Sequence, residues 1–192
     1  ILNKDLLKNV IAIIPAKGHS ERLENKNIYP IKKKPMIYWV IKSASKSKYI
    51  KNVYVSSEDM NILNIAKKNK AKVIKRPKIL SQKNVYKMDV IVHALNKIKK
   101  NSYPTLVCSI QANSPDLKSK DIDAAIKHLV KNNLNEVITV NKKKIQNSAL
   151  RVMKVNSVYQ RTLSTKVGFY QCEATDIHTI RDIKKINKHN LN

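Results

Sequence analysis

Glycine and cysteine are scarce in this chain, which has two of each among its 192 residues. Two cysteines allow at most one disulfide. Cys108 and Cys172 both lie inside apolar runs, so we expect buried free thiols in a reducing compartment. The single glycine in each half excludes both the G-x-G-x-x-G dinucleotide fingerprint and the G-x-x-x-x-G-K-[ST] phosphate loop.

Long apolar runs are absent as well. No segment approaches the ~20 uninterrupted apolar residues that a membrane helix needs. Asp5, Lys8 and Asn9 interrupt the first apolar stretch, which argues against a signal peptide. The sequence therefore predicts a cytoplasmic protein without a membrane partner. An apolar content of 42% favours a folded chain, and its length suits a single domain over residues 1–192.

Acidic residues are few, with 13 Asp and Glu against 39 Lys and Arg, giving a net charge of +26. Such a charge favours contact with phosphate backbones. However, 34 of the cations are lysine and 5 are arginine, and the chain also holds 24 isoleucines and 21 asparagines, a bias typical of an AT-rich coding sequence. The lysines are scattered, and base recognition favours arginine. We therefore expect no specific nucleic-acid partner.

Short apolar runs alternate with amphipathic segments along the whole chain. This order predicts an α/β fold of three layers, α/β/α and Rossmann-like, with a mostly parallel sheet and right-handed crossovers. A Thr179–Asp182 capping box marks the last helix, and Asp59 is a cap candidate for the second. The expected strands are 10–15, 53–55, 72–75, 105–111, 136–140, 150–155 and 167–172, and the expected helices are 36–44, a segment after residue 59, 88–98, 121–130 and 179–188.

Ligands of parallel α/β sheets bind beyond the carboxyl ends of strands, where the strand order reverses. The loops after Pro15, Val55, Gln111 and Cys172 are therefore the ones to inspect. The first of them carries Gly18 and several cations. Phosphate binding needs closely approaching backbone N–H groups, which glycine permits, and positive charge. The loop is thus either a phosphate loop or a lysine-rich surface turn.

The segment from residue 13 to 41, IIPAKGHSERLENKNIYPIKKKPMIYWVI, resembles the opening of the sugar-activating cytidylyltransferases. These are the acylneuraminate (CMP-sialic acid synthetase) family and its 3-deoxy-manno-octulosonate relatives. Their usual form is I-P-A-R-G-G-S-K-R-L-P-x-K-N-I, followed by G-K-P-[ML]-I-x-[WY]-x-I. Lys17 stands at the first arginine, Glu21 at a frequent lysine and Glu24 at the usual proline.

Later segments resemble the same family in the same order. VSSED at 55–59 resembles V-S-T-D-D, KRP at 75–77 with LS at 80–81 resembles R-P-x-x-L-[AS], and IQANSP at 110–115 resembles L-Q-P-T-S-P. GFY at 168–170 and DIHT at 176–179 resemble N-G-A-I-Y and the metal motif D-I-D-T. The resemblance covers residues 10 to 188.

The resemblance implies that a sugar acid's anomeric hydroxyl attacks the α-phosphate of CTP and releases pyrophosphate, giving a CMP-sugar of the sialic-acid-like or nonulosonic type. Mg²⁺, or alternatively Mn²⁺, would be the cofactor. Lys17, Arg22 and Lys26 would be the catalytic cations, with Gly18 and Ser20 shaping the phosphate loop, Asn27 on the ribose, Arg76 on the cytosine, Gln111 and Ser114 on the sugar acid, and Asp176 with His178 on the metal.

Structural interpretations of some of these residues stay open. Arg76 also suits a strand-end ion pair, Asp182 suits a helix cap better than a metal ligand, and His93 suits a hydrogen-bonded packing residue. Glu21 is expected to point away from the triphosphate or to pair with Arg22 or a lysine.

Two departures from the family pattern bear on the function. His178 replaces a metal carboxylate, and imidazole is a poorer Mg²⁺ ligand. The segment from Leu163 to Asp176 is shorter than in the sialic-acid enzymes, where it carries sugar and dimer contacts, so a homodimer stays open. Two alternatives remain: a nucleotidyltransferase of other nucleotide or sugar specificity, or a non-catalytic basic protein that binds nucleotides or nucleic acid.

Overall fold

Seven strands form one sheet in the order β5-β4-β1-β6-β8-β7-β9, and two very short strands pair separately as β2-β3. The computed structural model describes residues 3–160, 162–188 and 191, so Ile1 and Leu2 of the first apolar stretch lie outside the described residues. The strands are β1 (Val10–Pro15), β2 (Pro30–Ile31), β3 (Lys34–Pro35), β4 (Ile50–Ser57), β5 (Lys72–Lys75), β6 (Leu106–Ile110), β7 (Glu136–Val140), β8 (Gln146–Lys154) and β9 (Val167–Gln171).

The sheet is mostly parallel, as the sequence predicts. β1 pairs in parallel with β4 and β6, β4 with β5, and β7 with β9. β8 is the exception, because it runs antiparallel to both β6 and β7. It follows β7 through a short turn with no intervening helix, and such a connection joins antiparallel neighbours. The alternation of strands and helices therefore breaks at this hairpin, and β8 begins earlier than expected, at Gln146.

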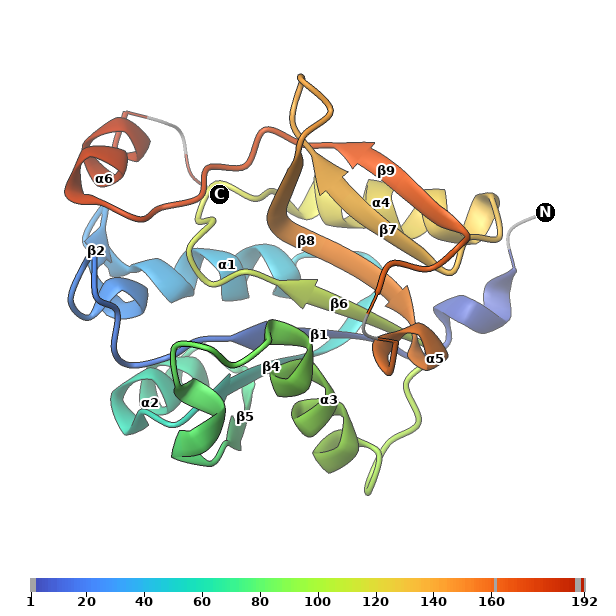
Figure 1. Cartoon of the computed structure of the whole chain (residues 1–192), viewed down its shortest axis with the longest axis horizontal. Coiled ribbons are helices and arrows are strands. Elements are labelled where there is room, and N and C mark those ends of the chain that lie inside the picture. Colours follow the sequence, from blue (N-terminus) through green and yellow to red (C-terminus); the bar gives the residue numbers. More distant parts are fainter. Residues whose placement is uncertain (1–2, 161, 189–190, 192) are drawn as a thin grey trace.

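Helices cover both faces of the sheet and complete the predicted three layers (Figure 1). α1, α2 and α4 supply buried residues to one core with β1, β4 and β6, and α3 and α5 supply residues to a second core on the opposite face. The α-helices are α1 (Met36–Ser45), α2 (Met60–Lys68), α3 (Lys87–Ile98), α4 (Ser119–Lys131), α5 (Val155–Val158) and α6 (Ile180–Ile186), and the 3₁₀ turns are η1 (Lys4–Leu7), η2 (Lys26–Ile28) and η3 (Lys78–Ser81).

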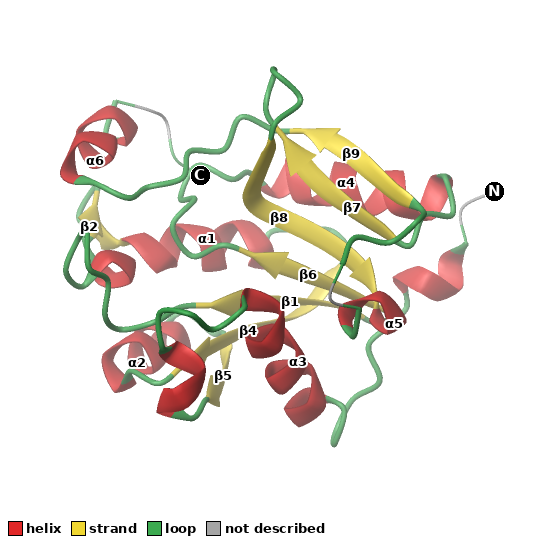
Figure 2. Ribbon diagram, in the orientation of Figure 1, coloured by secondary structure: helices red, strands yellow, loops and turns green. Residues whose placement is uncertain are grey.

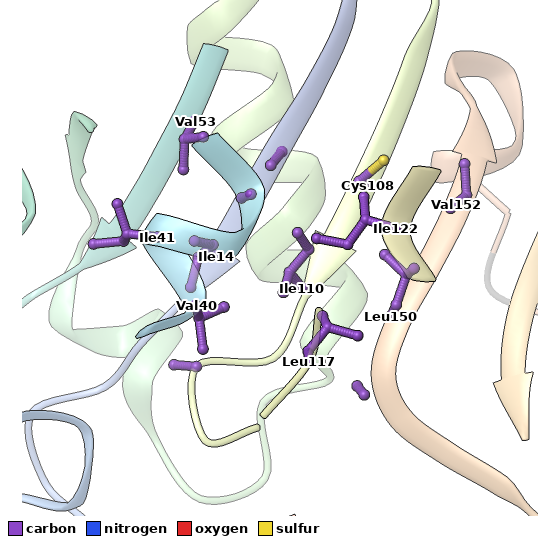
Figure 3. Packing of buried hydrophobic residues seen from close by; sticks show 14 of the residues in the cluster. Ile14, Val40, Ile41, Val53, Cys108, Ile110, Leu117, Ile122, Leu150 and Val152 are labelled. Carbon is purple, nitrogen blue, oxygen red and sulfur yellow. The ribbon is translucent and has the colours of Figure 1, made fainter. Parts of the chain in front are cut away.

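The larger core is made by branched aliphatic side chains from neighbouring strands. Figure 3 shows Ile14, Val53, Ile110 and Leu150 directed towards residues of the covering helices. Burial of such side chains is the main favourable term in folding. Cys108 lies in the same core, and Cys172 is also buried; both are free thiols, as predicted.

Local signals at two helix ends are confirmed. The Asp59 side chain accepts the Ile62 N–H at the start of α2, and Thr179 with Asp182 forms the expected capping box at the start of α6. The prediction for His93 is wrong at one ring nitrogen, because Nδ1 is buried and has no hydrogen-bond partner among the described residues.

The strand order reverses beside β1. From β1 the chain moves outward to β4 and β5, and α3 then carries it back across the sheet to β6 on the other side of β1. β1 and β6 end on the side of the molecule where β2 and α6 lie (Figures 1 and 2). Ligand sites of such sheets lie at this position. None of the helices in the described part of the chain is long and apolar enough to cross a membrane.

Candidate functional site

A pocket opens at the carboxyl ends of β1 and β6, at the reversal of strand order. Its walls come from the loop after β1, the segment between β5 and α3, the start of α3, the loop after β6 and the start of β8. The lining residues are Pro15, Lys17, Ser20, Lys26, Asn27, Arg76, Leu80, Ser81, Gln82, Lys83, Val85, Lys87, Val90, Gln111, Ala112, Asn113 and Ser148. Six of the predicted site residues therefore line one pocket: Lys17, Ser20, Lys26, Asn27, Arg76 and Gln111.

The loop after β1 is fixed from within. The Asn27 amide is buried and donates to the Lys17 carbonyl over 2.8 Å, which ties the two ends of the loop together. Partial burial lowers the pKa of Lys26, and although Asp176 opposes this shift, the nearby charges of Arg22 and Lys17 reinforce it. The loop therefore gathers positive charge, and a bound anion would relieve the repulsion between these cations.

Close packing against Asp59, and not approach to a ligand, explains the glycine at position 18. A Cβ atom at this position would lie 2.7 Å from Asp59 Oδ2 and 2.8 Å from Asp59 Cβ, so only glycine lets the loop pass the cap of α2. Its N–H donates to Glu58 Oε1 over 2.7 Å. Neither Gly18 nor the exposed Arg22 lines the pocket, and Arg22 contributes through its charge near Lys26.

Glu58 connects the loop after β1 to the segment after β5. Arg76 Nη2 donates to Glu58 Oε2 over 3.0 Å, Ser81 Oγ donates to the same oxygen, and Arg76 Nε donates to Ser81 Oγ over 2.8 Å. Arg76 Nη1 also donates to the Ser56 carbonyl over 3.3 Å. Three of the five guanidinium N–H groups thus have partners within the protein. The ion-pair interpretation of Arg76 is confirmed, while its expected contact with a base stays a prediction.

The same network sets the ionisation of Glu58. Burial on its own would raise the pKa of this carboxyl group, but the hydrogen bonds from Ser81 and Gly18 and the charge of Arg76 outweigh it and lower the pKa. Sequence reasoning gave Glu58 no role. The sequence signal for a role at the site is the position of Glu58 inside the VSSED motif, directly after a buried strand.

Asp176 lies at the centre of a second polar cluster. Its Oδ1 accepts from Asn113 Nδ2 over 2.6 Å and from Gln111 Nε2 over 3.2 Å, and its Oδ2 lies 2.8 Å from His178 Nε2. The Ile177 N–H donates to the Asn113 carbonyl, which ties this segment to the loop after β6. Asp176 and His178, distant in sequence from Gln111, are thereby brought next to it. Asn113 is a member of the cluster that sequence reasoning missed.

The donor set around Asp176 suits a hard cation only in part. Among the described residues, no group of three or more His, Cys, Asp and Glu side chains could hold a metal ion. Mg²⁺ is usually held by one or two carboxylates together with substrate phosphates and water, so one carboxylate beside a triphosphate fits that pattern. Asp182 is the helix cap that was expected, since its Oδ2 accepts from the N–H groups of His178 and Thr179.

The remaining predicted residues lie at the margins of the pocket. Ser114 is 1% exposed and does not line it, so the structure does not bring its side chain to the other site residues. Glu21 pairs with Lys83 over 3.2 Å, which confirms the expected lysine partner and links the loop after β1 to the pocket's opposite wall. Lys87 also lines the pocket and was not predicted as a site residue. The available signal was its place as the first residue of a helix, which is unusual for a lysine because the positive end of the helix dipole lies there.

Comparison with known proteins identifies the family. The profile described as "Cytidylyltransferase" matches residues 11–187. The chain belongs to the cytidylyltransferase family. Within it, the chain is 36% identical over 118 residues to a pseudaminic acid cytidylyltransferase of Campylobacter jejuni, covering 60% of this chain and 50% of that protein. It is 31% identical over 133 residues to N-acylneuraminate cytidylyltransferase A of Danio rerio, covering 69% of this chain and 30% of the relative.

A bifunctional Helicobacter pylori relative, named as a pseudaminic acid cytidylyltransferase and a hydrolase, is 32% identical over 123 residues, covering 64% of this chain and 24% of its own length. The chain thus spans half or less of these curated relatives. Among solved structures, a CMP:2-keto-3-deoxy-manno-octonic acid synthetase complexed with CTP superposes with a TM-score of 0.77 at 13% identity, covering 94% of this chain and 97% of the other. This likeness confirms the nucleotidyltransferase fold.

Proposed function

We propose that this cytidylyltransferase chain activates a keto-acid sugar with CTP, releasing pyrophosphate and forming a CMP-sugar. The observation that carries the proposal is the pocket at the reversal of strand order, where the cations after β1 lie in one cavity with Gln111. The relatives named above act on pseudaminic and N-acylneuraminic acids, which are the first acceptors to test.

The reaction would depend on positioning and on charge. The anomeric hydroxyl attacks the α-phosphate and gives up its proton to solvent, the bond from that phosphorus to the oxygen bridging the α- and β-phosphates breaks, and pyrophosphate leaves. The protein has little covalent chemistry to do, so holding the reactants in line and neutralising the triphosphate supply most of the rate. We assign triphosphate binding to Lys17, Ser20 and Lys26, with Arg22 as a further cation at the same loop.

The other assignments follow the position of each residue in the pocket. Asn27 would bind the ribose and Arg76 the cytosine, through the two guanidinium N–H groups not already hydrogen-bonded within the protein. Gln111 would contact the sugar acid. Asp176 would hold Mg²⁺ or Mn²⁺, with His178 beside it, and the ion would offset phosphate charge as a Lewis acid. Catalysis in the cytoplasm and the oligomeric state stay predictions.

The test is pyrophosphate release by the purified chain with CTP, Mg²⁺ or Mn²⁺, and each of N-acetylneuraminic, pseudaminic and 3-deoxy-manno-octulosonic acids. We expect release with at least one acid, dependence on CTP over ATP, GTP and UTP, and a large loss in Lys26→Met. Exposed Lys70→Met, which lies away from the pocket, is the matched control. Absence of release with every acid, or a preference for another nucleotide, would overturn the proposal.

A further inference from the structure

Lys87 is a pocket lysine that the proposed function leaves without a role. It is the first residue of α3 and lines the pocket together with Gln111 and Asn113. Its side chain is half-buried, and within the described part of the chain its ammonium has no ion pair. A partly buried cation with no partner costs free energy unless a ligand supplies the opposite charge.

A second cation lies close to Lys87 from the sheet. Arg151 of β8 stands opposite Ser109 of β6, and Gln111 follows Ser109 by two residues, directly after the end of β6, so it points to the same face of the sheet. The Gln111 N–H donates to the Ala149 carbonyl over 3.0 Å, so the pairing of these strands continues as far as Gln111, which lines the pocket. Arg151 Nε donates to the wholly buried Glu136 over 2.6 Å, but its Nη2 is buried without a partner among the described residues.

The electrostatic balance around Lys87 is unfavourable in the absence of a ligand. Burial lowers the pKa of Lys87 and the charge of Arg151 lowers it further, against the opposing effect of Asp176. The N-terminus of α3 adds its positive dipole. The charge of Asp176 also acts on Lys26, and Asp176 already has hydrogen bonds from Asn113 and Gln111. One carboxylate therefore serves several cations.

We propose that Lys87, supported by Arg151 and the start of α3, forms a subsite for the carboxylate of the acceptor sugar acid. The inference rests on the proposed function and adds the group that recognises the acid. It favours the acceptor over the triphosphate because the charges that act on Lys87 are those of Arg151, on β8, and Asp176, which accepts from Gln111. Lys17, Ser20 and Lys26 instead come from the loop after β1. An acceptor that binds Lys87 while its hydroxyl attacks the triphosphate must carry its carboxylate next to that hydroxyl.

The experiment compares wild-type protein with Lys87→Met, Lys87→Arg and Lys97→Met. Lys97 is the matched control, because it is an exposed lysine on the same helix outside the pocket. The acceptor is whichever of the three acids gives the fastest pyrophosphate release in wild type, and its carboxamide derivative serves as the uncharged probe. KM is measured for CTP, for the acid and for the carboxamide.

We expect Lys87→Met to raise KM for the acid by about 10- to 100-fold, the range for losing a charge-assisted hydrogen bond, with KM for CTP nearly unchanged. Wild type should prefer the acid to the carboxamide, Lys87→Met should lose that preference, and Lys87→Arg should retain most of it. A purely structural role for Lys87 would raise both acceptor KM values together and leave the preference intact.

Three outcomes would overturn the inference, and they are distinguishable. If Lys87→Met keeps the preference for the acid, Lys87 does not bind the carboxylate. If it raises KM for CTP and not for the acid, the subsite belongs to the triphosphate. If wild type neither gains thermal stability from CTP nor releases pyrophosphate with any acid, the proposed function fails and the acceptor subsite fails with it.

Discussion

Replacing Glu58 by glutamine should separate the loop after β1 from the segment after β5. The Glu58 carboxylate accepts the Gly18 N–H on one oxygen and Arg76 and Ser81 on the other. A glutamine side chain has the same shape but carries one amide NH₂ group. In either orientation that NH₂ faces a donor, either the Gly18 N–H or the Arg76 guanidinium, and the charge that balances Arg76 is gone.

The size of the effect follows from burial. The Arg76 side chain is 3% exposed and that of Glu58 is 14% exposed, so the substitution leaves a buried guanidinium without its counter-charge. Removing one partner of such a pair typically costs about 3 kcal/mol. For a domain of this size, that corresponds to a fall in Tm of roughly 6–12 °C. Lys83→Met breaks an ion pair whose side chains are 74% and 62% exposed, and should change stability by less than about 0.5 kcal/mol.

The assay is urea denaturation of wild type, Glu58→Gln, Arg76→Met and the double variant, together with KM for CTP. We expect the double variant to be more stable than the sum of the single effects predicts, because the remaining buried charge is also removed. We further expect a raised KM for CTP in Glu58→Gln, since Gly18 and Ser81 lose their common anchor.

The pH dependence gives an independent check on the same carboxylate. Because the folded-state pKa of Glu58 is lowered, its stabilisation is complete above the pKa of an unfolded glutamate and is lost as the pH falls through the folded value. The stability difference between wild type and Glu58→Gln should therefore shrink in acid. Equal stability of the two proteins at neutral pH, or a difference that does not change with pH, would refute the reasoning.

Three further substitutions test separate parts of the site. Gly18→Ala places a Cβ atom 2.7 Å from Asp59 Oδ2, and the forced shift should cost about 1–3 kcal/mol by urea denaturation; an unchanged midpoint would contradict the packing explanation. Because the pKa of Lys26 is lowered, calorimetric CTP affinity should fall as the pH rises through a value below that of ordinary lysine, and Lys26→Arg should flatten this profile; equal profiles would remove Lys26 from triphosphate binding. His178→Asp places a second carboxylate beside Asp176, which should destabilise the chain without metal and increase its thermal stabilisation by Mg²⁺; no change in the Mg²⁺ response would exclude this position from the metal site.

Local patterns were sufficient to predict most of the fold. The strands at Val10–Pro15, Lys72–Lys75 and Glu136–Val140 have the expected bounds. The first and the third are almost wholly buried, as expected for strands of a sheet that is covered on both faces. The direction of β8 was not predictable in the same way. Whether a strand runs parallel or antiparallel depends on the connection before it, and the turn between β7 and β8 carries no glycine and no proline to mark a hairpin.

The site was predictable only as far as its residues belong to contiguous motifs. Lys17, Ser20, Lys26 and Asn27 lie in one segment, and the resemblance of that segment to a known family was enough to bring them together. The contacts that fix the site join distant parts of the chain: Glu58 bonds Gly18, 40 residues away, and Asp176 bonds Asn113, 63 residues away.

Long-range contacts also change what a residue can do. Arg76 was assigned to base recognition by its motif alone, but its burial and its partners Glu58 and Ser81 leave only part of the guanidinium for a ligand. Lys87, in contrast, belongs to no motif. Only the structure shows that it lines the pocket and that the charge of Arg151 acts on it. A cation whose partners lie within the protein holds the site in shape, whereas a half-buried cation without one is where a ligand's charge is expected. By that criterion we expect the acceptor's carboxylate at Lys87 and the triphosphate at Lys17 and Lys26.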